Sequence, residues 1–395
     1  MKILIFGWLI LSFFFLKQQP DPSLPAGMAE AIFAVEKKYA PDKRTVIFKV
    51  VPHLNQGHWV ISGEANDPKA KSALLNALKP FSVIDSIELL PSKALHNKTY
   101  GIITIPVANM RSATGHNSEL SNQALCGTVI RIYKSYNGWY YCQTPDDYIG
   151  WIDDGAIQVM DSAEMIAWSK KRKVIVISDQ SYVVQAPAFG SNVVSPLSVG
   201  AILPAGIPVK GYYPVLFADG RNGFIPANNV MDLNQWKKQQ SQTLSTDGVI
   251  KSAYAFLGRP YLWGGTSGNG MDCSGFTKMV FFEHGLLLPR DASQQVRVGL
   301  SIETDSTLKN LLPGDFLFFG RKAANNLPEK VTHVAIYVGD GKIIHASGFI
   351  QEQSLRRGDS TFVEHRLHSL LRATRPLAAP KEHGIFALSD LKYYD

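Results

Sequence analysis

The sequence predicts an α+β protein that is built from several domains. Its 395 residues exceed the length of one typical domain, so the chain should divide into units that each have their own core. Apolar residues follow a helical spacing near the N-terminus, then form short β runs punctuated by Gly and Asn, and finally form a helix followed by alternating strands. These changes predict a small α/β unit, then β-rich domains, then a larger α+β domain.

Residues 1–20 are typical of a signal peptide. The basic Lys2 precedes an apolar run over 3–16, which is too short to span a bilayer comfortably. Polar residues 17–19 end the run, and no small-x-small cleavage site follows, so an uncleaved membrane anchor is the alternative. No cysteine lies near the run, which argues against a lipid anchor. After signal cleavage we expect no stable membrane insertion.

Residues 28–97 predict a small α/β domain. Helical spacing covers 29–39, and a second helix over 68–78 begins after Asp67 with a proline in its first turn. Three strand-like runs accompany the helices, at residues 45–51, 58–63 and 84–90. This domain carries no catalytic constellation, so the sequence assigns it no role beyond packing or spacing.

Residues 98–162 and 173–236 are both rich in short β runs, as small barrels are. The two share an echo of five residues, which reads YIGWI at 148–152 and RNGFI at 221–225. With Asn109-Met110-Arg111 upstream, the first unit resembles a bacterial SH3-like domain, and the second resembles a more divergent one. We expect Trp151 and Phe224, the aromatic residues of the echo, to belong to the barrel cores.

The most specific motif is the segment 270–276, Gly-Met-Asp-Cys-Ser-Gly-Phe, in which Cys273 opens a helical pattern. Asp272 or Ser274 can cap this helix, and Gly285 can end it. Cys273 would then lie at the positive end of the helix dipole, where unpaired backbone N–H groups favour a thiolate over a thiol. The same N–H groups can donate to an oxyanion, so the position suits a nucleophile.

Two histidines follow on a predicted β-hairpin, whose turn signal is Gly-Asp-Gly at 339–341. A three-residue loop that pairs Val338 with Lys342 would place His333 and His345 diagonally on one face, close enough to hydrogen-bond. A two-residue loop would put them on opposite faces. A cysteine with two such histidines has the parts of a thiol nucleophile, its general base and the group that orients the base.

Other chemistries are less well supported by the sequence. A Cys/His/His zinc site is an alternative, but no tight ligand pair such as Cys-x-x-Cys is present, so we expect no metal and no organic cofactor. Cys126 and Cys142 can pair in an oxidising compartment or remain buried thiols, and Cys273 stays unpaired in both cases. The net charge of +7 is modest, and the basic run 170–173 fits a solvated linker, so we expect no nucleic-acid binding.

Four motifs over residues 245–378 resemble the NlpC-type family of papain-like cell-wall peptidases. They are Tyr261-Leu-Trp-Gly-Gly, Met271-Asp-Cys-Ser-Gly-Phe, Leu312-Pro-Gly-Asp-Phe-Leu-Phe-Phe and His333-Val-Ala-Ile-Tyr-Val-Gly. The resemblance implies a papain-like catalytic domain that is preceded by the two SH3-like barrels and the small α/β unit. It leaves residues 379–395 as a C-terminal tail.

The same resemblance implies roles for individual residues. Cys273 would be the nucleophile, His333 the general base and His345 the residue that orients His333. Tyr261 would lie beside the cysteine, where its hydroxyl helps to bind the oxyanion. Support for the oxyanion or the cleft would come from the two neighbours of the cysteine, Asp272 and Ser274.

Two barrels before such a domain resemble a narrower group, the γ-D-glutamyl-diamino-acid endopeptidases that act on freed stem peptides. In that group the first barrel blocks one end of the cleft, and acidic groups hold the amine of a free N-terminal L-alanine. Asp291, Glu119 and Tyr148 match this pocket, although the family often has serine directly after the aspartate, whereas Ser293 comes one later here. Asp291 can also cap a helix with Gln294 completing a capping box, and Glu119 can be a solvated turn residue.

These resemblances imply an exported cysteine peptidase of the periplasm or cell envelope. Its partners would be the stem peptides of peptidoglycan (muropeptides), and it would hydrolyse the γ-D-glutamyl bond of L-Ala-γ-D-Glu-diamino-acid peptides and release L-Ala-D-Glu. One alternative is an endopeptidase of polymeric peptidoglycan whose barrels bind the wall. Another is a non-catalytic wall-binding protein, which the intact Cys, His, His set disfavours. The preferred diamino acid and the oligomeric state stay open.

Overall fold

The computed structural model describes residues 24–324, 326–378 and 385–390. The expected signal peptide, residues 1–20, lies outside these ranges. Within them, no helix has both the length and the apolar character that a membrane crossing requires. The chain forms two compact units, of which the smaller takes in the described residues up to Pro41 and Phe48–Glu88, and the larger takes in Asp42–Ile47 and the residues from Leu89 onward.

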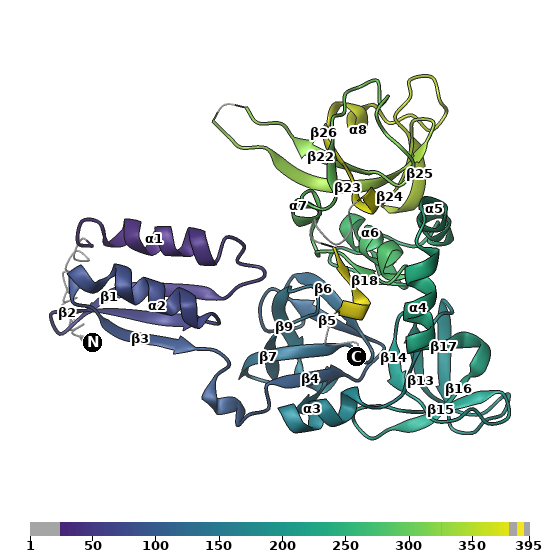
Figure 1. Ribbon diagram of the computed structural model, residues 1–395, viewed down its shortest axis with the longest axis horizontal. Helices are drawn as coiled ribbons and strands as arrows, with labels where there is room; N and C mark the ends of the chain where they lie inside the picture. The colour runs from purple at the N-terminus through teal and green to yellow at the C-terminus, as the bar shows by residue number, and fades with distance from the viewer. Residues whose placement is uncertain (1–23, 325, 379–384, 391–395) are drawn as a thin grey trace, which may run out of the picture. The chain divides into compact units, whose positions relative to one another are not determined.

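The smaller unit has two helices and a three-stranded sheet in the order β1-β2-β3 (Figure 1). Asp67 begins the second helix because its carboxylate accepts a hydrogen bond from the N–H of Lys69 at 2.8 Å. The strand expected at 45–51 begins only at Phe48, since the turn before it belongs to the larger unit. The elements are α1 (Met28–Tyr39), β1 (Phe48–Asn55), β2 (His58–Ala65), α2 (Pro68–Ala77) and β3 (Ile84–Leu89).

The first β-rich region of the larger unit is a seven-stranded sheet in the order β10-β4-β7-β8-β9-β5-β6. Its core contains Met110, Cys142 and Ile152, none of which is exposed to solvent. Its strands are β4 (Tyr100–Ile103), β5 (Val107–Arg111), β6 (Leu120–Leu125), β7 (Val129–Tyr136), β8 (Trp139–Gln143), β9 (Ile149–Asp153) and β10 (Ile157–Met160), and α3 (Ser162–Ser169) follows them.

The second β-rich region contains two sheets, in the orders β14-β11-β17 and β13-β12-β16-β15. Cys126 packs into the core of this region, so it lies in a different core from Cys142, and both are free thiols. The elements are β11 (Lys173–Val176), β12 (Gln180–Val184), β13 (Val193–Ser198), β14 (Ile202–Pro204), β15 (Tyr212–Leu216), β16 (Asn222–Pro226), β17 (Val230–Asp232) and α4 (Leu233–Thr243).

The echo between the two β-rich regions falls on corresponding strands, but its aromatic residues do not form the cores. Ile152 on β9 and Ile225 on β16 are fully buried, whereas Trp151 and Phe224 are only partly buried. Side chains alternate across a strand, so the residue after each aromatic faces the core instead. Trp151 packs on the ring of Tyr141, with 4.9 Å between the ring centroids. Trp151 therefore packs against the edge of a small core, whereas Phe224 belongs to no core cluster of the described residues, so the expectation that both are core residues holds only in part.

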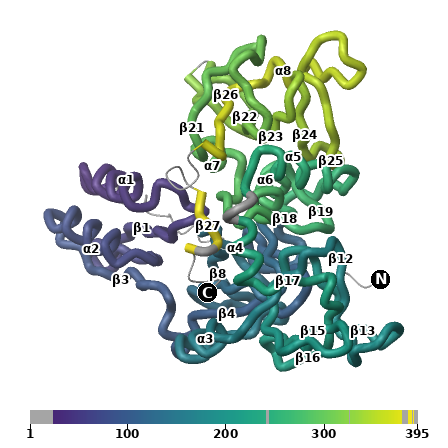
Figure 2. Tube along the Cα trace, turned by 45° about the vertical axis from the view of Figure 1, so that its right-hand side comes forward, coloured from purple at the N-terminus to yellow at the C-terminus, as the bar shows by residue number. Residues whose placement is uncertain are grey.

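The C-terminal region packs helix α6 against a six-stranded sheet in the order β21-β26-β22-β23-β24-β25. In Figure 1, α6 lies between this sheet and strands β5 and β6 of the first β-rich region, and Figure 2 shows the same sheet above α6. Its elements are α5 (Thr246–Ala255), β18 (Thr266–Ser267), β19 (Gly270–Met271), α6 (Cys273–Phe282), β20 (Leu286–Leu287), α7 (Ala292–Gln295), β21 (Leu300–Ile302), β22 (Phe316–Arg321), β23 (Lys330–Gly339), β24 (Lys342–Ser347), β25 (Phe349–Ser354), α8 (Glu364–His368) and β26 (Leu370–Arg375).

Part of the expected C-terminal tail belongs to this fold. Strand β27 (Phe386–Ala387) pairs antiparallel with β20, and Leu388 is only 1% exposed. Residues 385–388 therefore pack against the larger unit, although the sequence analysis placed them in a tail outside the peptidase-like domain.

The hairpin of β23 and β24 reaches the expected arrangement by a different turn. The turn holds two residues, 340–341, both with positive φ (48° and 76°), and Gly339 pairs with Lys342. The expected three-residue loop is therefore wrong, because two left-handed residues give the turn that matches strand twist. A β-bulge directly before Gly339 absorbs the extra residue and restores the register, so His333 and His345 still share a face.

Candidate functional site

Cys273 is the first residue of α6, and a network of hydrogen bonds fixes this helix start. The carboxylate of Asp272 accepts from the N–H of Gly275 at 2.7 Å, which caps the helix. Arg290, which is 1% exposed, donates two hydrogen bonds to Asp272 at 3.0 and 2.6 Å and a third to the hydroxyl of Ser274 at 3.1 Å. Asp272 and Ser274 therefore hold the cysteine in place through a buried arginine that the sequence analysis did not identify.

The thiol of Cys273 is protonated in the free site. Burial raises the pKa of Cys273 to about 11, and the nearby charge of Asp272 adds to this effect. Backbone hydrogen bonds of Val334 and Ser274 and the charge of Arg290 act in the opposite direction but are weaker. The backbone hydrogen bond at the helix start lowers the pKa of Cys273, as expected, but the loss of solvation is the larger effect and sets the direction of the shift.

His333 and His345 form a hydrogen-bonded chain that sets their tautomers. Nε2 of His333 lies 2.7 Å from Nδ1 of His345, and Nε2 of His345 lies 2.8 Å from the amide oxygen of Gln353 on β25. Since this oxygen accepts, His345 carries its proton on Nε2 and accepts on Nδ1, so His333 donates from Nε2. This leaves Nδ1 of His333 without a proton and able to act as a base. Gln353 was not identified from the sequence.

Both imidazoles are neutral at neutral pH. Burial, followed by the positive charge of Arg366, lowers the pKa of His333 well below its usual value. The same two causes lower the pKa of His345 to about 4, although the hydrogen bond to Gln353 acts against them. A proton transfer from this thiol to His333 would therefore begin from two neutral groups and not from a preformed ion pair.

Seven of the predicted site residues line one cavity of about 420 Å³. The histidines are buried on β23 and β24 and do not line it, but the cavity wall includes residues 330–332, directly before His333. The seven residues come from the first β-rich region, from the loop before β18 and from the starts of the helices α6 and α7. They are Glu119, Tyr148, Tyr261, Asp272, Cys273, Ser274 and Asp291.

The first β-rich region packs tightly against Gly264 in the wall of the cavity. A Cβ at Gly264 would lie 2.3 Å from the carbonyl oxygen of Leu120, and the φ of Gly264 is +76°. Next to this contact, the indole N–H of Trp263 donates to the exposed carboxylate of Glu119 at 2.8 Å. Strand β6 therefore approaches the loop before β18, and Glu119 is held at the cavity by Trp263.

Asp291 begins α7, and its carboxylate turns toward two other side chains. The side chain of Gln294 accepts a hydrogen bond from the backbone N–H of Asp291 at 3.0 Å, and the Asp291 side chain accepts from the backbone N–H of Gln294, which is the expected capping box. The carboxylate oxygen Oδ2 accepts from Arg44 at 2.6 Å and from the hydroxyl of Tyr148 at 3.4 Å. Burial and the charge of Asp291 raise the pKa of Tyr148, so this hydroxyl stays protonated. Nothing in the sequence pattern pointed to Arg44.

Tyr261 and Arg366 complete the surroundings of the cysteine. Burial raises the pKa of Tyr261 to about 12, so its hydroxyl remains a donor at neutral pH. The guanidinium of Arg366, on α8, donates to the hydroxyl of Ser347 at 3.3 Å and lies over the ring of Phe319. Its Nε is buried without a partner, and no acidic residue in the described part of the chain pairs with it. Arg366 is a further site residue that the sequence analysis missed.

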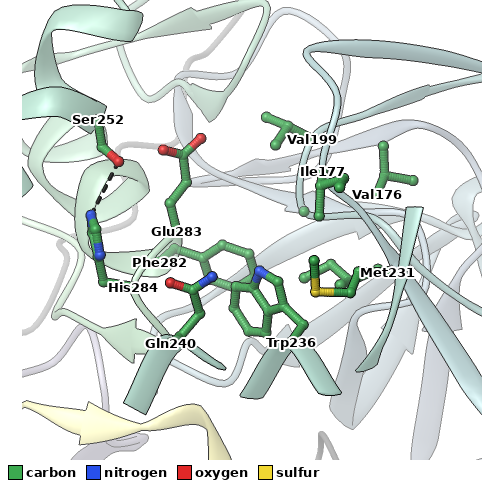
Figure 3. Close-up of a pocket in the computed structure, with 12 residues that line it drawn as sticks. Val176, Ile177, Val199, Met231, Trp236, Gln240, Ser252, Phe282, Glu283 and His284 are labelled. Atoms are coloured by element: carbon green, nitrogen blue, oxygen red, sulfur yellow. Dashed lines mark hydrogen bonds between the residues drawn. The ribbon is translucent and has the colours of Figure 1, made fainter. Parts of the chain in front are cut away.

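A second cavity of about 310 Å³ lies apart from this site. Figure 3 shows it between α4, the end of α6 and strands of the second β-rich region, with the rings of Trp236 and Phe282 on one side. The hydroxyl of Ser252 lies 3.1 Å from Nε2 of His284, drawn as a dashed line. None of the predicted site residues lines this cavity. In the described ranges, no cluster of three His, Cys, Asp or Glu side chains has the arrangement of a metal site.

Family models match two parts of the chain. Residues 258–372 match the NlpC/P60 family, and residues 110–157 match the bacterial dipeptidyl-peptidase Sh3 domain. The first match contains Cys273 and both histidines, and the second contains Glu119 and Tyr148. The predicted α+β class, with a papain-like peptidase domain of this family and an SH3-like domain, is confirmed.

Two curated relatives and one solved structure are similar to the chain. A γ-D-glutamyl-L-lysine dipeptidyl-peptidase of Bacillus cereus is 29% identical over 58% of this chain and 68% of its own length. One of Bacillus subtilis is 34% identical over 38% of this chain and 46% of its own length. The crystal structure of an NlpC/P60 family protein from Bacillus cereus aligns with 70% of this chain and 99% of its own, with a TM-score of 0.57 and 22% identity. At that identity, the structural likeness shows the fold.

Proposed function

We propose that this cysteine peptidase, whose NlpC/P60 domain follows a bacterial dipeptidyl-peptidase SH3 domain in the chain, acts as a dipeptidyl-peptidase on peptidoglycan stem peptides. The substrate is L-Ala-γ-D-Glu-diamino acid with a free N-terminal amine, and the products are L-Ala-D-Glu and the remaining amine. One observation carries this proposal: Glu119, Tyr148 and Asp291 line the same cavity as Cys273. The names of the curated relatives support the same bond.

The chemistry begins with a proton transfer between two neutral groups. Nδ1 of His333 takes the proton of the Cys273 thiol as the sulfur attacks the γ-carbonyl carbon of the glutamyl residue. The negative charge moves to the carbonyl oxygen, where the hydroxyl of Tyr261 and backbone N–H groups at the start of α6 stabilise it. His345 keeps the imidazole of His333 in the required tautomer and orientation.

The intermediate then collapses, and the C–N bond breaks. His333 returns the proton to the leaving amine of the diamino acid, and a thioester remains on Cys273. Water, deprotonated by His333, attacks this thioester and releases L-Ala-D-Glu with a free γ-carboxylate, which restores the thiol. No step in this sequence needs a metal or an organic cofactor.

The amine of the substrate is bound at the closed end of the cavity. The carboxylates of Glu119 and Asp291 supply the negative charge that an ammonium needs, and the hydroxyl of Tyr148 supports Asp291. An acetylated amine has no charge and is larger, so it could not neutralise these carboxylates as the free ammonium does. The proposal includes export to the cell envelope through residues 1–20, because peptidoglycan fragments are found there.

Mass spectrometry of the products from defined substrates tests this function. The full chain should cleave L-Ala-γ-D-Glu-L-Lys or its diaminopimelate analogue, it should cleave the N-acetylated peptide far more slowly, and it should leave intact sacculi uncut. Cys273→Ala, with an unchanged circular dichroism spectrum, is the inactive control, and iodoacetamide but not a chelator should inhibit the wild type. Similar rates on the free peptide and on sacculi would instead support the endopeptidase of polymeric peptidoglycan.

A further inference from the structure

The segment 42–47 joins α1 to β1 but is packed in the larger unit. The backbone N–H of Ile149 on β9 donates to the carbonyl of Arg44 at 2.7 Å, and the side-chain amide of Gln143 on β8 donates to the carbonyl of Thr45 at 3.0 Å. Ile47, which is 2% exposed, packs in a small core with residues of β7, β8 and β9. The segment is therefore anchored on the first β-rich region by hydrogen bonds and by the buried side chain of Ile47.

This anchoring brings the side chain of Arg44 to Asp291, 247 positions later in the chain. Nη1 of Arg44 donates to Asp291 at 2.6 Å and to the hydroxyl of Ser293 at 2.8 Å. Nε and Nη2 donate to the two carboxylate oxygens of Asp42 at 2.8 and 2.7 Å. Asp42 in turn accepts from the side-chain amide of Gln294 at 2.9 Å. The guanidinium is thus fixed from both sides and cannot turn without breaking several charge-assisted hydrogen bonds.

The cluster carries one uncompensated negative charge. Burial alone would raise the pKa of Asp42, but hydrogen bonds from Arg44 and Gln294 outweigh it and lower the pKa to about 2, so Asp42 is ionised at neutral pH. Two carboxylates, Asp42 and Asp291, therefore share the single guanidinium of Arg44. The net charge of −1 is the charge that one substrate ammonium would neutralise.

The cluster also leaves one acceptor for that ammonium. Oδ2 of Asp291 accepts from Arg44 and Tyr148, and the carboxylate also accepts from the backbone N–H of Gln294 in the capping box of α7. A carboxylate has about four acceptor sites, so one remains for the ammonium. Asp291 lines the cavity that contains Cys273, and Arg44 does not. Arg44 can therefore act on a substrate only through Asp291.

We infer that Arg44 and Asp42 are positioning residues for the substrate amine: they hold the Asp291 carboxylate in one orientation and set the net charge of the amine pocket. The inference rests on the proposed function. It gives the connection between α1 and β1 a role in substrate selection, which the sequence did not assign to the N-terminal region. Without Asp42, Arg44 and Asp291 would form a neutral pair, and only Glu119 would supply net negative charge to the ammonium. Without Arg44, Asp291 would lose the contact that fixes its orientation.

Steady-state kinetics of the full chain test this inference, with L-Ala-γ-D-Glu-L-Lys and its N-acetyl form as substrates. Arg44→Gln and Asp42→Asn should each raise KM for the free peptide about tenfold, with kcat changed by less than about threefold, because the lost interaction acts on binding of the amine. Arg44→Lys should recover part of this loss, since an ammonium can contact Asp291 but cannot make the two-pronged contact with Asp42. Arg172→Gln is the matched control, because Arg172 pairs with Asp232 at 2.9 Å in the second β-rich region.

The ratio of kcat/KM for the free peptide to that for the acetylated peptide separates the outcomes. The inference requires that this ratio falls in Arg44→Gln and stays at the wild-type value in Arg172→Gln. A variant that was merely destabilised would lose activity on both peptides, and its ratio would not change. If the wild type discriminates between the peptides and Arg44→Gln retains its KM and ratio, the inference is wrong and the proposed function stands. If the wild type does not discriminate, both are wrong.

Discussion

Nε2 of His333 donates a hydrogen bond to Nδ1 of His345 over 2.7 Å, and His345 is itself oriented by the amide oxygen of Gln353. The direction of donation follows from the far end of this chain, because an amide oxygen can only accept. Since Nε2 of His333 already carries a proton, Nδ1 is the nitrogen of His333 that can accept one. The second histidine therefore contributes by orienting the first and does not exchange a proton with the substrate in the proposed mechanism.

The two histidines should differ in their importance for activity. His333→Ala removes the proposed general base, and kcat/KM should fall on the order of 10²-fold or more. His345→Gln keeps a side chain that can accept from His333, so it should retain more activity than His333→Ala. Gln353→Ala should have the smallest effect of the three, because Gln353 contacts His345 and acts on His333 only through it. Equal losses at both histidines, or a larger loss at His345, would show that the roles are divided wrongly.

The protonation state of Cys273 can be measured directly. Since burial raises the pKa of Cys273 to about 11, the thiolate fraction of the free enzyme should rise about tenfold per pH unit between pH 7 and 10. The rate of alkylation by iodoacetamide, followed at the Cys273 peptide by mass spectrometry, should rise in the same way. A plateau beginning near neutral pH would instead reveal a preformed thiolate–imidazolium pair.

The site shows which features of such a protein can be predicted from sequence. Cys273 and the two histidines lie in short motifs whose helix start and strand alternation follow from local patterns, so the sequence alone was enough to propose them. Arg290, Gln353 and Arg366 were not found, because each is placed by contacts between elements far apart in the chain. Arg44 is the extreme case, since it reaches Asp291 across 247 positions from a turn with no distinctive pattern.

The hairpin shows the same limit at short range. The residues 339–341 correctly signalled a turn, but its length depends on the twist of the paired strands, which residue types alone do not express. The β-bulge before Gly339 compensated for the shorter turn. The face shared by His333 and His345 was therefore predicted correctly from a loop that was predicted wrongly.

Arg366 should control the acid side of the pH profile. Its positive charge, after burial, is the next largest cause that lowers the pKa of His333, which must be neutral to accept a proton. Arg366→Met removes this charge, so the pKa of His333 should rise and the acid limb of kcat/KM should move to higher pH. Arg357→Met is the control, because Arg357 is exposed and pairs with Glu364 at 2.8 Å. An acid limb that stays in place in Arg366→Met would contradict this electrostatic role.

A buried ion pair should stabilise the junction between α6 and the first β-rich region. The ammonium of Lys278 on α6 pairs with the carboxylate of Asp146, and the two side chains are only 10% and 1% exposed. Lys278→Met would leave the carboxylate buried without a counter-charge, although the side chain of Asn122 still donates to it at 3.2 Å. The free energy of unfolding should therefore fall by about 3–5 kcal/mol, as it does when one partner of a buried pair is removed.

The double variant Lys278→Met with Asp146→Asn separates two effects, which are the loss of the ion pair and the presence of one buried charge without its partner. An asparagine carries no charge that needs compensation, so the double variant should recover most of the stability that Lys278→Met loses. Urea unfolding, followed by tryptophan fluorescence, measures the free energy of unfolding of the single variant, the double variant and a surface control against that of the wild type. Lys342→Met is the surface control, because Lys342 is 46% exposed and its pair with Glu352 should contribute at most about 1 kcal/mol. If Lys278→Met is no more destabilising than Lys342→Met, the buried pair does not hold the helix that carries Cys273.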